Sequence, residues 1–215
     1  MVLFLTILSG LCWCIVYEEC IRIGFSKKTY VMPFFALGLN LTWETVYTFS
    51  DIFFLAHGPL IGMNLIQVIV NITWVCLDLI ILWIYCKYGQ KEWRPTLSRL
   101  SFVHWTVLII LCCFLLQIAF IQEFGFMKAA IYAAFLQNLV MSLLFIKRYL
   151  TVGYLGAQSK LLAIAKWIGT LAPSILFGLS QNNWLVLTAG IFCSVFDFIY
   201  IILLTKPHYI SSQKA

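Results

Sequence analysis

Residues 65–85 read LIQVIVNITWVCLDLIILWIY, an apolar run in which the one charged residue is Asp78. About 20 apolar residues are enough for a helix to cross the hydrocarbon core of a membrane. Six similar runs occupy most of the rest of the chain: 2–20, 31–49, 103–121, 127–146, 161–180 and 184–204. The pattern predicts a single all-α membrane domain over residues 1–215, built as a bundle of seven transmembrane helices.

The overall composition agrees with a membrane protein. The chain has 215 residues, of which 63% are hydrophobic and 10% are charged, and its mean hydropathy is +0.97. A soluble domain has roughly 25% charged residues. The eight cysteines form no CxxC pair and fall mostly in the apolar runs, so they predict packing residues rather than disulfides. With the three histidines far apart, we expect no metal site and no cofactor.

The basic residues predict the orientation of the bundle. They gather in the first, third and fifth loops and in the C-terminal tail: Arg22, Lys27, Lys28, Lys87, Lys91, Arg94, Arg99, Lys147, Arg148, Lys160, Lys206 and Lys214. Loops two and six have none, and loop four has Lys128 at its edge. The positive-inside rule therefore predicts an outside or lumenal N-terminus and a cytoplasmic C-terminus. The net charge of +6 reflects this topology and contact with the lipid bilayer, and we expect no nucleic acid partner.

Two residues of the sixth run and the start of the chain carry further expectations. Lys166 lies a turn and a half from the cytoplasmic end, from which its side chain is expected to reach the membrane surface. Pro173 is the one proline inside a run, and it predicts a kink there. The first run has no preceding basic residue and no cleavage pattern, so we interpret it as a membrane span rather than a signal peptide.

Three of the eight acidic residues lie deep in the apolar runs: Glu44, Asp78 and Asp197. Glu44 lies roughly 16 Å along its helix from Pro33, and the other two lie about 10 Å from the cytoplasmic ends of theirs. Ionisable groups at such depth are costly and usually face the interior of a bundle. We therefore expect the three acids to line one cavity.

Each buried acid shares a helical face with an aromatic ring. Tyr47 follows Glu44 by three residues, Tyr200 follows Asp197 by three, and Trp74 precedes Asp78 by four. A carboxyl group in apolar surroundings keeps its proton, because burial disfavours the anion, and aromatic faces stabilise cations. This combination is what protonation-initiated cyclisation of a polyene requires. The alternative is that the three acids have only a structural role and accept hydrogen bonds from neighbouring hydroxyl and amide groups.

At these residues the sequence resembles the small seven-span membrane terpene cyclases of fungal indole-diterpene and meroterpenoid pathways and their bacterial relatives. The resemblance covers nearly the whole chain and is carried by six segments: NLTWETVY (40–47), WVCLD (74–78), QNLVMS (137–142), QS (158–159), IGT (168–170) and GIFCSVFDFIY (190–200). In that family a glutamate of span two and an aspartate of the last span are the catalytic acids. The resemblance places these roles on Glu44 and Asp197.

The resemblance implies a metal-independent reaction of the class II type, in which a terminal epoxide or alkene of a polyprenyl chain on an aromatic or polyketide head is protonated. The chain has neither a DxDD nor a DDxxD box. A prenyltransferase and an epoxidase are expected to act upstream. The enzyme is expected in the endoplasmic reticulum of a eukaryote or the plasma membrane of a bacterium. The residues expected to contact the substrate are Asn40, Trp43, Tyr47, Trp74, Asp78, Asn138, Phe196 and Tyr200.

A second function is compatible with the same pattern. Seven spans can form a 3+1+3 repeat, and buried acids couple protons in transporters. Asp78 and Asp197 occupy matching places in the third and seventh runs, but the sixth run has no acid where the second has Glu44. The sequence therefore favours a cyclase over a small proton-coupled transporter, and both over a purely structural protein.

Overall fold

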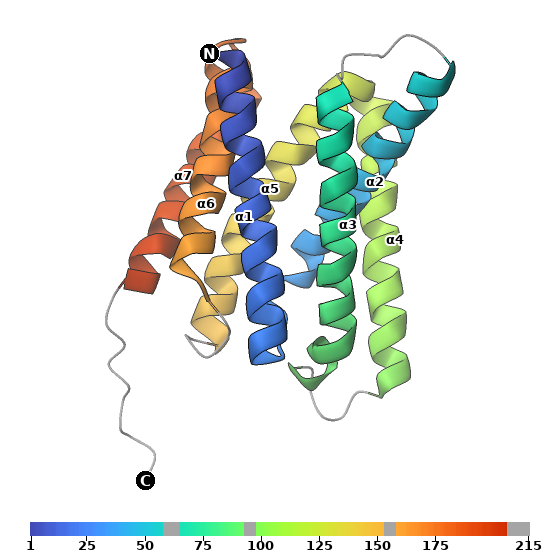
Figure 1. Cartoon of the computed structure of the whole chain (residues 1–215), viewed down its shortest axis with the longest axis vertical. Coiled ribbons are helices and arrows are strands. Elements are labelled where there is room, and N and C mark those ends of the chain that lie inside the picture. The colour runs from blue at the N-terminus through green and yellow to red at the C-terminus, as the bar shows by residue number, and fades with distance from the viewer. Residues whose placement is uncertain (58–64, 93–97, 153–157, 206–215) are drawn as a thin grey trace.

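The computed structural model of the chain describes residues 1–57, 65–92, 98–152 and 158–205. Within these residues it contains no strand, and its helices form one bundle (Figure 1). The long helices are α1 (Val2–Lys27), α2 (Phe34–His57), α3 (Leu65–Tyr88), α4 (Arg99–Phe124), α5 (Phe126–Val152), α6 (Lys160–Pro173) and α7 (Trp184–Thr205). A short 3-10 turn, η1 (Gly89–Glu92), follows α3.

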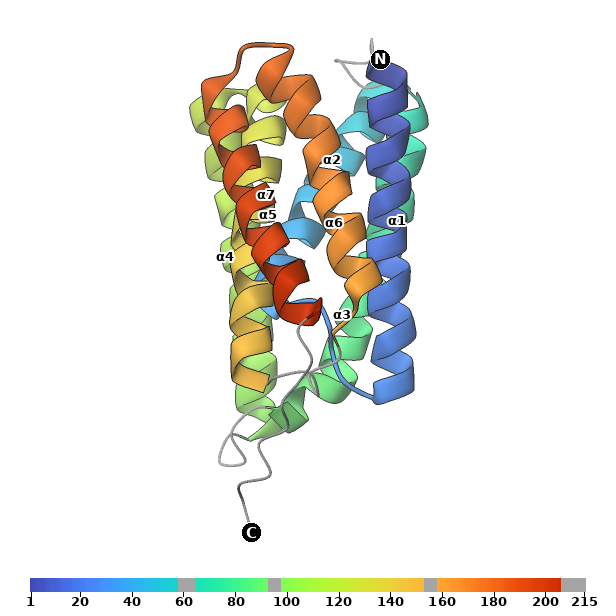
Figure 2. The ribbon, with the colours of Figure 1, turned by 90° about the vertical axis from the view of Figure 1, so that its left-hand side faces the viewer.

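The helices pack in a closed ring whose order differs from their order in the sequence. Around the ring, α1 contacts α3, α3 contacts α2, and α2 contacts α4; α4 then contacts α5, which contacts α7, and α6 closes the ring between α7 and α1. Helix α2 also contacts α5 across the middle of the bundle. The view in Figure 2 shows α6 and α7 in front, with α1 beside α6. This arrangement surrounds the inner face of α2 with helices α3, α4 and α5.

Among the residues that the structure describes, six helices are long and apolar enough to cross a membrane. Helix α2 carries four polar side chains that the bundle buries: Asn40, Thr42, Glu44 and Thr48. Thr42 satisfies its hydroxyl group on the backbone carbonyls of its own helix. Asn40 and Glu44 have hydrogen-bond partners on neighbouring helices, as polar groups inside a bilayer require.

The structure shows how the chain accommodates Pro173. Helix α6 ends at this residue, and the chain continues as a π-helical segment, η3 (Ser174–Leu179). Proline has no N–H group to bond the carbonyl four residues earlier, which here belongs to Gly169. The Ser9 hydroxyl of α1 donates to that carbonyl at 2.8 Å. The sequence predicted a kink at Pro173, and the structure has a change from α-helix to π-helix there. The freed Gly169 carbonyl joins α6 to α1.

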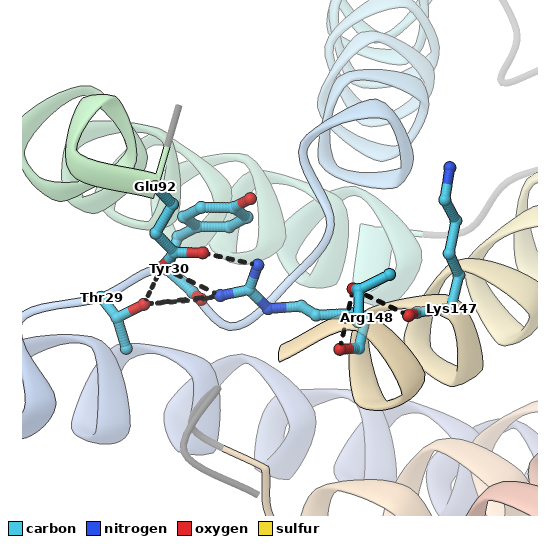
Figure 3. A network of polar contacts seen from close by, with 6 residues as sticks. Thr29, Tyr30, Glu92, Lys147 and Arg148 are labelled. Carbon is cyan, nitrogen blue, oxygen red and sulfur yellow. Dashed lines mark hydrogen bonds and ion pairs between the residues drawn. The ribbon is translucent and has the colours of Figure 1, made fainter. Parts of the chain in front are cut away.

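A buried arginine fastens the end of the bundle at which α5 finishes (Figure 3). Arg148 is 7% exposed, and its guanidinium donates to the Tyr30 carbonyl at 2.6 Å and pairs with the Glu92 carboxylate at 3.0 Å. The guanidinium also lies 3.9 Å from the centre of the Tyr30 ring. Thr29 donates a hydrogen bond to Glu92. Arg148 therefore holds together α5, η1 and the connection that leads into α2.

Replacing this arginine should destabilise the protein. Arg148→Gln leaves a partly buried Glu92 carboxylate without its cation, at a cost of about 2–3 kcal/mol, below that of a fully buried pair. We expect the midpoint of thermal unfolding in detergent to fall by several degrees. The neighbouring exposed Lys147 offers the control, because Lys147→Gln should leave the midpoint unchanged. Equal midpoints for the two variants would contradict this role of Arg148.

Candidate active site

Four side chains from three helices form a buried polar cluster around Glu44. Asn40 and Glu44 are one turn apart on α2, and Tyr17 of α1 and Asp78 of α3 reach the same point. The Tyr17 hydroxyl donates to Glu44 Oε1. Asn40 Nδ2 lies 3.3 Å from the same Oε1 and 3.3 Å from Asp78 Oδ2. Glu44 is 2% exposed and Asp78 is fully buried, so the cluster is closed to water.

The two carboxyl groups of the cluster each have one oxygen atom without a partner. Within the described residues, Glu44 Oε2 and Asp78 Oδ1 are buried and accept no hydrogen bond, and Trp74 Nε1 donates none. Since Tyr17 and Asn40 both donate to Oε1 of Glu44, a proton on this residue belongs on Oε2. That atom is the free proton-bearing position of the cluster.

The orientation of the Asn40 amide is set from a fourth helix. Gln137 of α5 donates from Nε2 to Asn40 Oδ1 at 2.9 Å. With its oxygen occupied in this way, Asn40 must turn its NH₂ group toward the carboxyl groups. Asn40 also donates to the Tyr17 oxygen. The hydrogen-bond chain therefore runs from Gln137 through Asn40 and Tyr17 to Glu44.

Aromatic rings line one side of the cluster. The centroid of the Tyr17 ring lies 6.3 Å from that of Trp13 and 6.3 Å from that of Trp74. Ring faces at such positions stabilise positive charge through their quadrupoles. Trp74, expected from the sequence to share a face with Asp78, thus contacts the tyrosine that binds Glu44. The sequence spacing predicted that Trp74 shares a helical face with Asp78, but it did not predict the contact with Tyr17.

The expected aromatic residues on α2 form a second group. Trp43 and Tyr47 have ring centroids 4.9 Å apart, and Phe126 lies 5.0 Å from Tyr47. The Trp43 indole donates to the Ala130 carbonyl of α5 at 2.9 Å, which anchors α2 to α5. The buried Tyr47 hydroxyl has no partner among the described residues. Trp43 is therefore tied into the scaffold, whereas Tyr47 keeps an unused polar group.

The structure places Asp197 in a separate cluster. Lys166 Nζ lies 2.8 and 2.9 Å from the two carboxylate oxygens of Asp197 and 2.6 Å from the Ser142 hydroxyl. Lys166 is fully buried, and Asp197 is 1% exposed. The expectation that Lys166 reaches the membrane surface is wrong, because its ammonium group is bound by a carboxylate inside the bundle. Asp197 faces a cation, whereas Glu44 faces neutral donors and a second carboxyl group.

The remaining residues expected at the site have different surroundings. The Tyr200 hydroxyl donates to Gln158 Oε1, and its ring centroid lies 5.6 Å from that of Phe145. Asn138 and Phe196 are half-buried, and the Asn138 Oδ1 atom has no partner in the described chain. The structure thus brings Asn40, Glu44, Trp74 and Asp78 together. It adds Tyr17 and Gln137, which the sequence reasoning did not assign to the site.

Comparison with known proteins decides the family. The model of the Pyr4-like transmembrane terpene cyclases matches residues 1–208. The chain belongs to this family. The Pyr4-family terpene cyclase mfmH of Annulohypoxylon moriforme is 24% identical to this chain over 175 residues, which cover 80% of this chain and 68% of that protein. The terpene cyclase pyr4 of Aspergillus fumigatus is 22% identical over 209 residues, covering 92% and 83%.

Shorter matches have higher identity. The terpene cyclase macJ of Penicillium terrestre is 29% identical over 108 residues, half of this chain and 37% of that protein. No solved structure matches the chain. The family resolves the choice between the two functions that the sequence left open, in favour of a membrane terpene cyclase. The resemblance inferred from the six segments is confirmed.

The ion pair of the second cluster can be tested apart from the chemistry. Lys166→Met leaves a buried carboxylate without a cation, which costs about 3–5 kcal/mol, so we expect a large loss of thermal stability in detergent. The double variant Lys166→Met/Asp197→Asn removes both charges and should regain most of that stability. A double variant as unstable as Lys166→Met alone would show that the pair does not account for the loss.

Proposed function

We propose that Glu44 starts the reaction by protonating the terminal epoxide or alkene of a polyprenyl chain attached to an aromatic or polyketide head group. The observation that carries this proposal is the asymmetric environment of its carboxyl group. One oxygen atom accepts hydrogen bonds from Tyr17 and Asn40, and the other is buried without a partner. Within the described chain, no protein group competes with a substrate for the second oxygen atom.

The neighbours of Glu44 suit both stages of such a proton transfer. Before the transfer, the donors on Oε1 keep the proton on Oε2. After it, Tyr17 and Asn40 stabilise the glutamate anion, because hydrogen bonds to an ionised group are the strong ones. The unpartnered indole N–H of Trp74 is a further donor that an epoxide oxygen can accept. The carboxylate would thus form without a counter-cation or water.

The cation that follows needs a different environment. When the epoxide opens, positive charge develops on carbon and moves along the chain as rings close. The rings of Trp13, Tyr17 and Trp74 stabilise this charge and keep water from capturing it. The cascade ends when the cation loses a proton or the head group attacks it. The proton released at this step returns to the Glu44–Asp78 pair, so that the product is an isomer of the substrate.

The resemblance assigns Asp197 a catalytic role, and we propose that it acts as an anion. Both of its oxygen atoms lie within 2.9 Å of Lys166 Nζ, which favours a carboxylate over a proton donor. Such a charge can favour the cationic intermediates or relay a proton. We propose that Asp78 helps to keep the proton on Glu44 and returns a proton to Glu44 after each turnover. We propose that a prenyltransferase acts upstream of this enzyme, together with an epoxidase where the protonated group is an epoxide.

The decisive variant is Glu44→Gln, which preserves size and hydrogen bonding but has no proton to give. Loss of a general acid alone reduces a rate by about 10² to 10⁴, and we expect at least this loss of cyclised product with accumulation of the linear prenylated substrate. Exposed Glu18 supplies the control, because Glu18→Gln should cyclise at the wild-type rate. Both variants are compared at equal amounts of membrane protein. Wild-type turnover by Glu44→Gln would rule out its role as the acid.

We also propose that the N-terminus is outside or lumenal and the C-terminus cytoplasmic. The ends of α1, α3 and α5 and the beginnings of α4 and α6 lie at the same end of the bundle (Figure 1), and basic residues concentrate there. Lys27 ends α1, Lys87 lies in the last turn of α3, and Arg99 begins α4. The curated relatives named above are fungal, which favours the endoplasmic reticulum.

Reporter fusions test this orientation. A reporter placed after Ala215 should be cytoplasmic, and one inserted at His57 should be on the opposite side of the membrane. Lys128 lies near the other end of the bundle, but one lysine does not outweigh the larger number of basic residues at the proposed cytoplasmic end. The reverse pattern of reporter activity would contradict the proposed orientation.

A further inference from the structure

A groove lies on the outer surface of the bundle between α1 and α3, near the end at which both helices finish (Figure 1). Its volume is about 450 Å³. Phe25, Leu79 and Trp83 are each about half exposed, so this outer groove opens toward the bilayer. Aliphatic and aromatic side chains line it: Ile21, Phe25, Leu79, Ile80 and Trp83.

The two helices close the inner side of the outer groove. Gly24 and Ile84, the chain neighbours of Phe25 and Trp83, are buried. A Cβ atom added at Gly24 would lie 2.9 Å from Ile84 Cγ2, so the helices leave no passage between them at this level. A molecule in the outer groove therefore stays on the surface of the bundle.

A cation lies beside one end of the outer groove. Phe25 and Trp83, whose ring centroids are 5.6 Å apart, form this aromatic end. Lys87 is exposed, and its Nζ atom lies 4.3 Å from the centre of the Trp83 ring. Lys91 is also exposed and follows one turn, or about 6 Å, further along the chain. A contact between an exposed ammonium group and a ring is weak, so Lys87 can still bind an anion.

The acidic residues at this end of the bundle do not neutralise these lysines. The carboxylates of Glu19 and Glu92 are paired with arginines. Glu18, the other acid of α1, lies about 10 Å along the helix from the aromatic end of the outer groove. Among the described residues, neither Lys87 nor Lys91 forms an ion pair with a carboxylate. An apolar groove therefore ends beside positive charge that the protein itself leaves unpaired.

We infer that the outer groove binds an acyl chain of an anionic phospholipid, whose phosphate group lies beside Lys87. The inference is independent of the role of Glu44. The lining matches the acyl chain, and the ammonium group forms charge-assisted hydrogen bonds with phosphate oxygens. Basic residues beside transmembrane helices bind anionic head groups at the membrane surface. Trp83 then lies where the hydrocarbon meets the head groups, the depth at which tryptophan is enriched.

Two other occupants match these observations less well. A second copy in the same membrane has the same orientation, so a two-fold contact at the outer groove would bring the Lys87 and Lys91 side chains of both copies together. Like charges placed opposite each other disfavour such a contact. A neutral prenyl chain would fill the groove but leave the lysines without an anion. An anionic phospholipid satisfies both the lining and the charge.

The preference for an anionic head group can be measured as lipid retention. The enzyme is reconstituted in vesicles of equal parts dioleoylphosphatidylserine and dioleoylphosphatidylcholine, extracted in mild detergent, and its bound lipids are counted by native mass spectrometry. A basic residue near the surface contributes about a five-fold preference for anionic lipid. We expect the wild-type enzyme to retain the serine lipid by at least this factor and Lys87→Gln to lower the preference about five-fold. Lys147→Gln, an equal loss of charge from the exposed side of α5, should keep it.

A second variant tests the apolar part of the site without changing its charge. Ile80→Trp places a bulky ring in the outer groove, so retention of the serine lipid should fall at least as far as in Lys87→Gln. Ile72 is equally exposed on α3 but does not line the groove. Ile72→Trp should therefore retain lipid like the wild-type enzyme.

Four outcomes would overturn the inference. The wild-type enzyme would retain both lipids equally, or Lys147→Gln would lose the preference as Lys87→Gln does. Release of the serine lipid by inorganic phosphate at constant ionic strength would indicate an anion site that does not hold the acyl chain. A dimer that Ile80→Trp dissociates would assign the outer groove to a second copy. Release of the lipid by the linear prenylated substrate would assign it to the substrate.

Discussion

The Asn40 amide is the contact on which the polar centre of this bundle depends. Its oxygen atom accepts from Gln137 of α5, and its nitrogen atom donates to Glu44 of α2 and Asp78 of α3. In a bilayer each buried polar group needs a partner inside the protein. One amide here contacts polar groups on four helices: α1, α2, α3 and α5. Removing it would take a partner from the Gln137 donor and from the Asp78 Oδ2 acceptor at once, because the members of such a network depend on one another.

The two clusters show how the partner of a buried acid decides what the acid can do. Glu44 is surrounded by hydroxyl, amide and carboxyl groups, all of which tolerate a neutral, protonated glutamic acid. Asp197 is bound by the ammonium group of Lys166, which stabilises the anion. The resemblance noted from the sequence assigned both residues the role of catalytic acids. The structure of this chain supports two different roles, in which Glu44 donates a proton and Asp197 contributes a negative charge.

The sequence predicted the elements well because their causes are local. Apolar run length predicted each helix, and the missing N–H of Pro173 predicted a kink at the place where α6 gives way to η3. The helices extend beyond the predicted runs, for example α1 to Lys27 and α5 to Val152, because a helix continues past the hydrocarbon core, where polar residues are tolerated. Depth along the run also identified Glu44 and Asp78 as buried acids.

Partners across helices could not be predicted in this way. Helical periodicity tells which side chains share a face, but it does not tell which helices face each other. Tyr17 gave no signal, since a tyrosine in an apolar run is ordinary, and Lys166 looked like a residue near the membrane surface. Each has its partner on the long helix that follows its own: Tyr17 on α2, and Lys166 on α7. Gln137 lies in one of the segments that resemble the family. Its hydrogen bond to Asn40 could not be predicted, because it depends on the contact between α2 and α5.

The central claim is that Glu44, and not Asp197, holds the proton that starts cyclisation. Infrared spectroscopy of the enzyme in lipid measures this directly, because a protonated carboxyl group has a carbonyl stretch that a carboxylate lacks. We predict that Glu44→Gln weakens or removes this band and that Asp197→Asn leaves it intact. A band that disappears in Asp197→Asn and persists in Glu44→Gln would contradict the account.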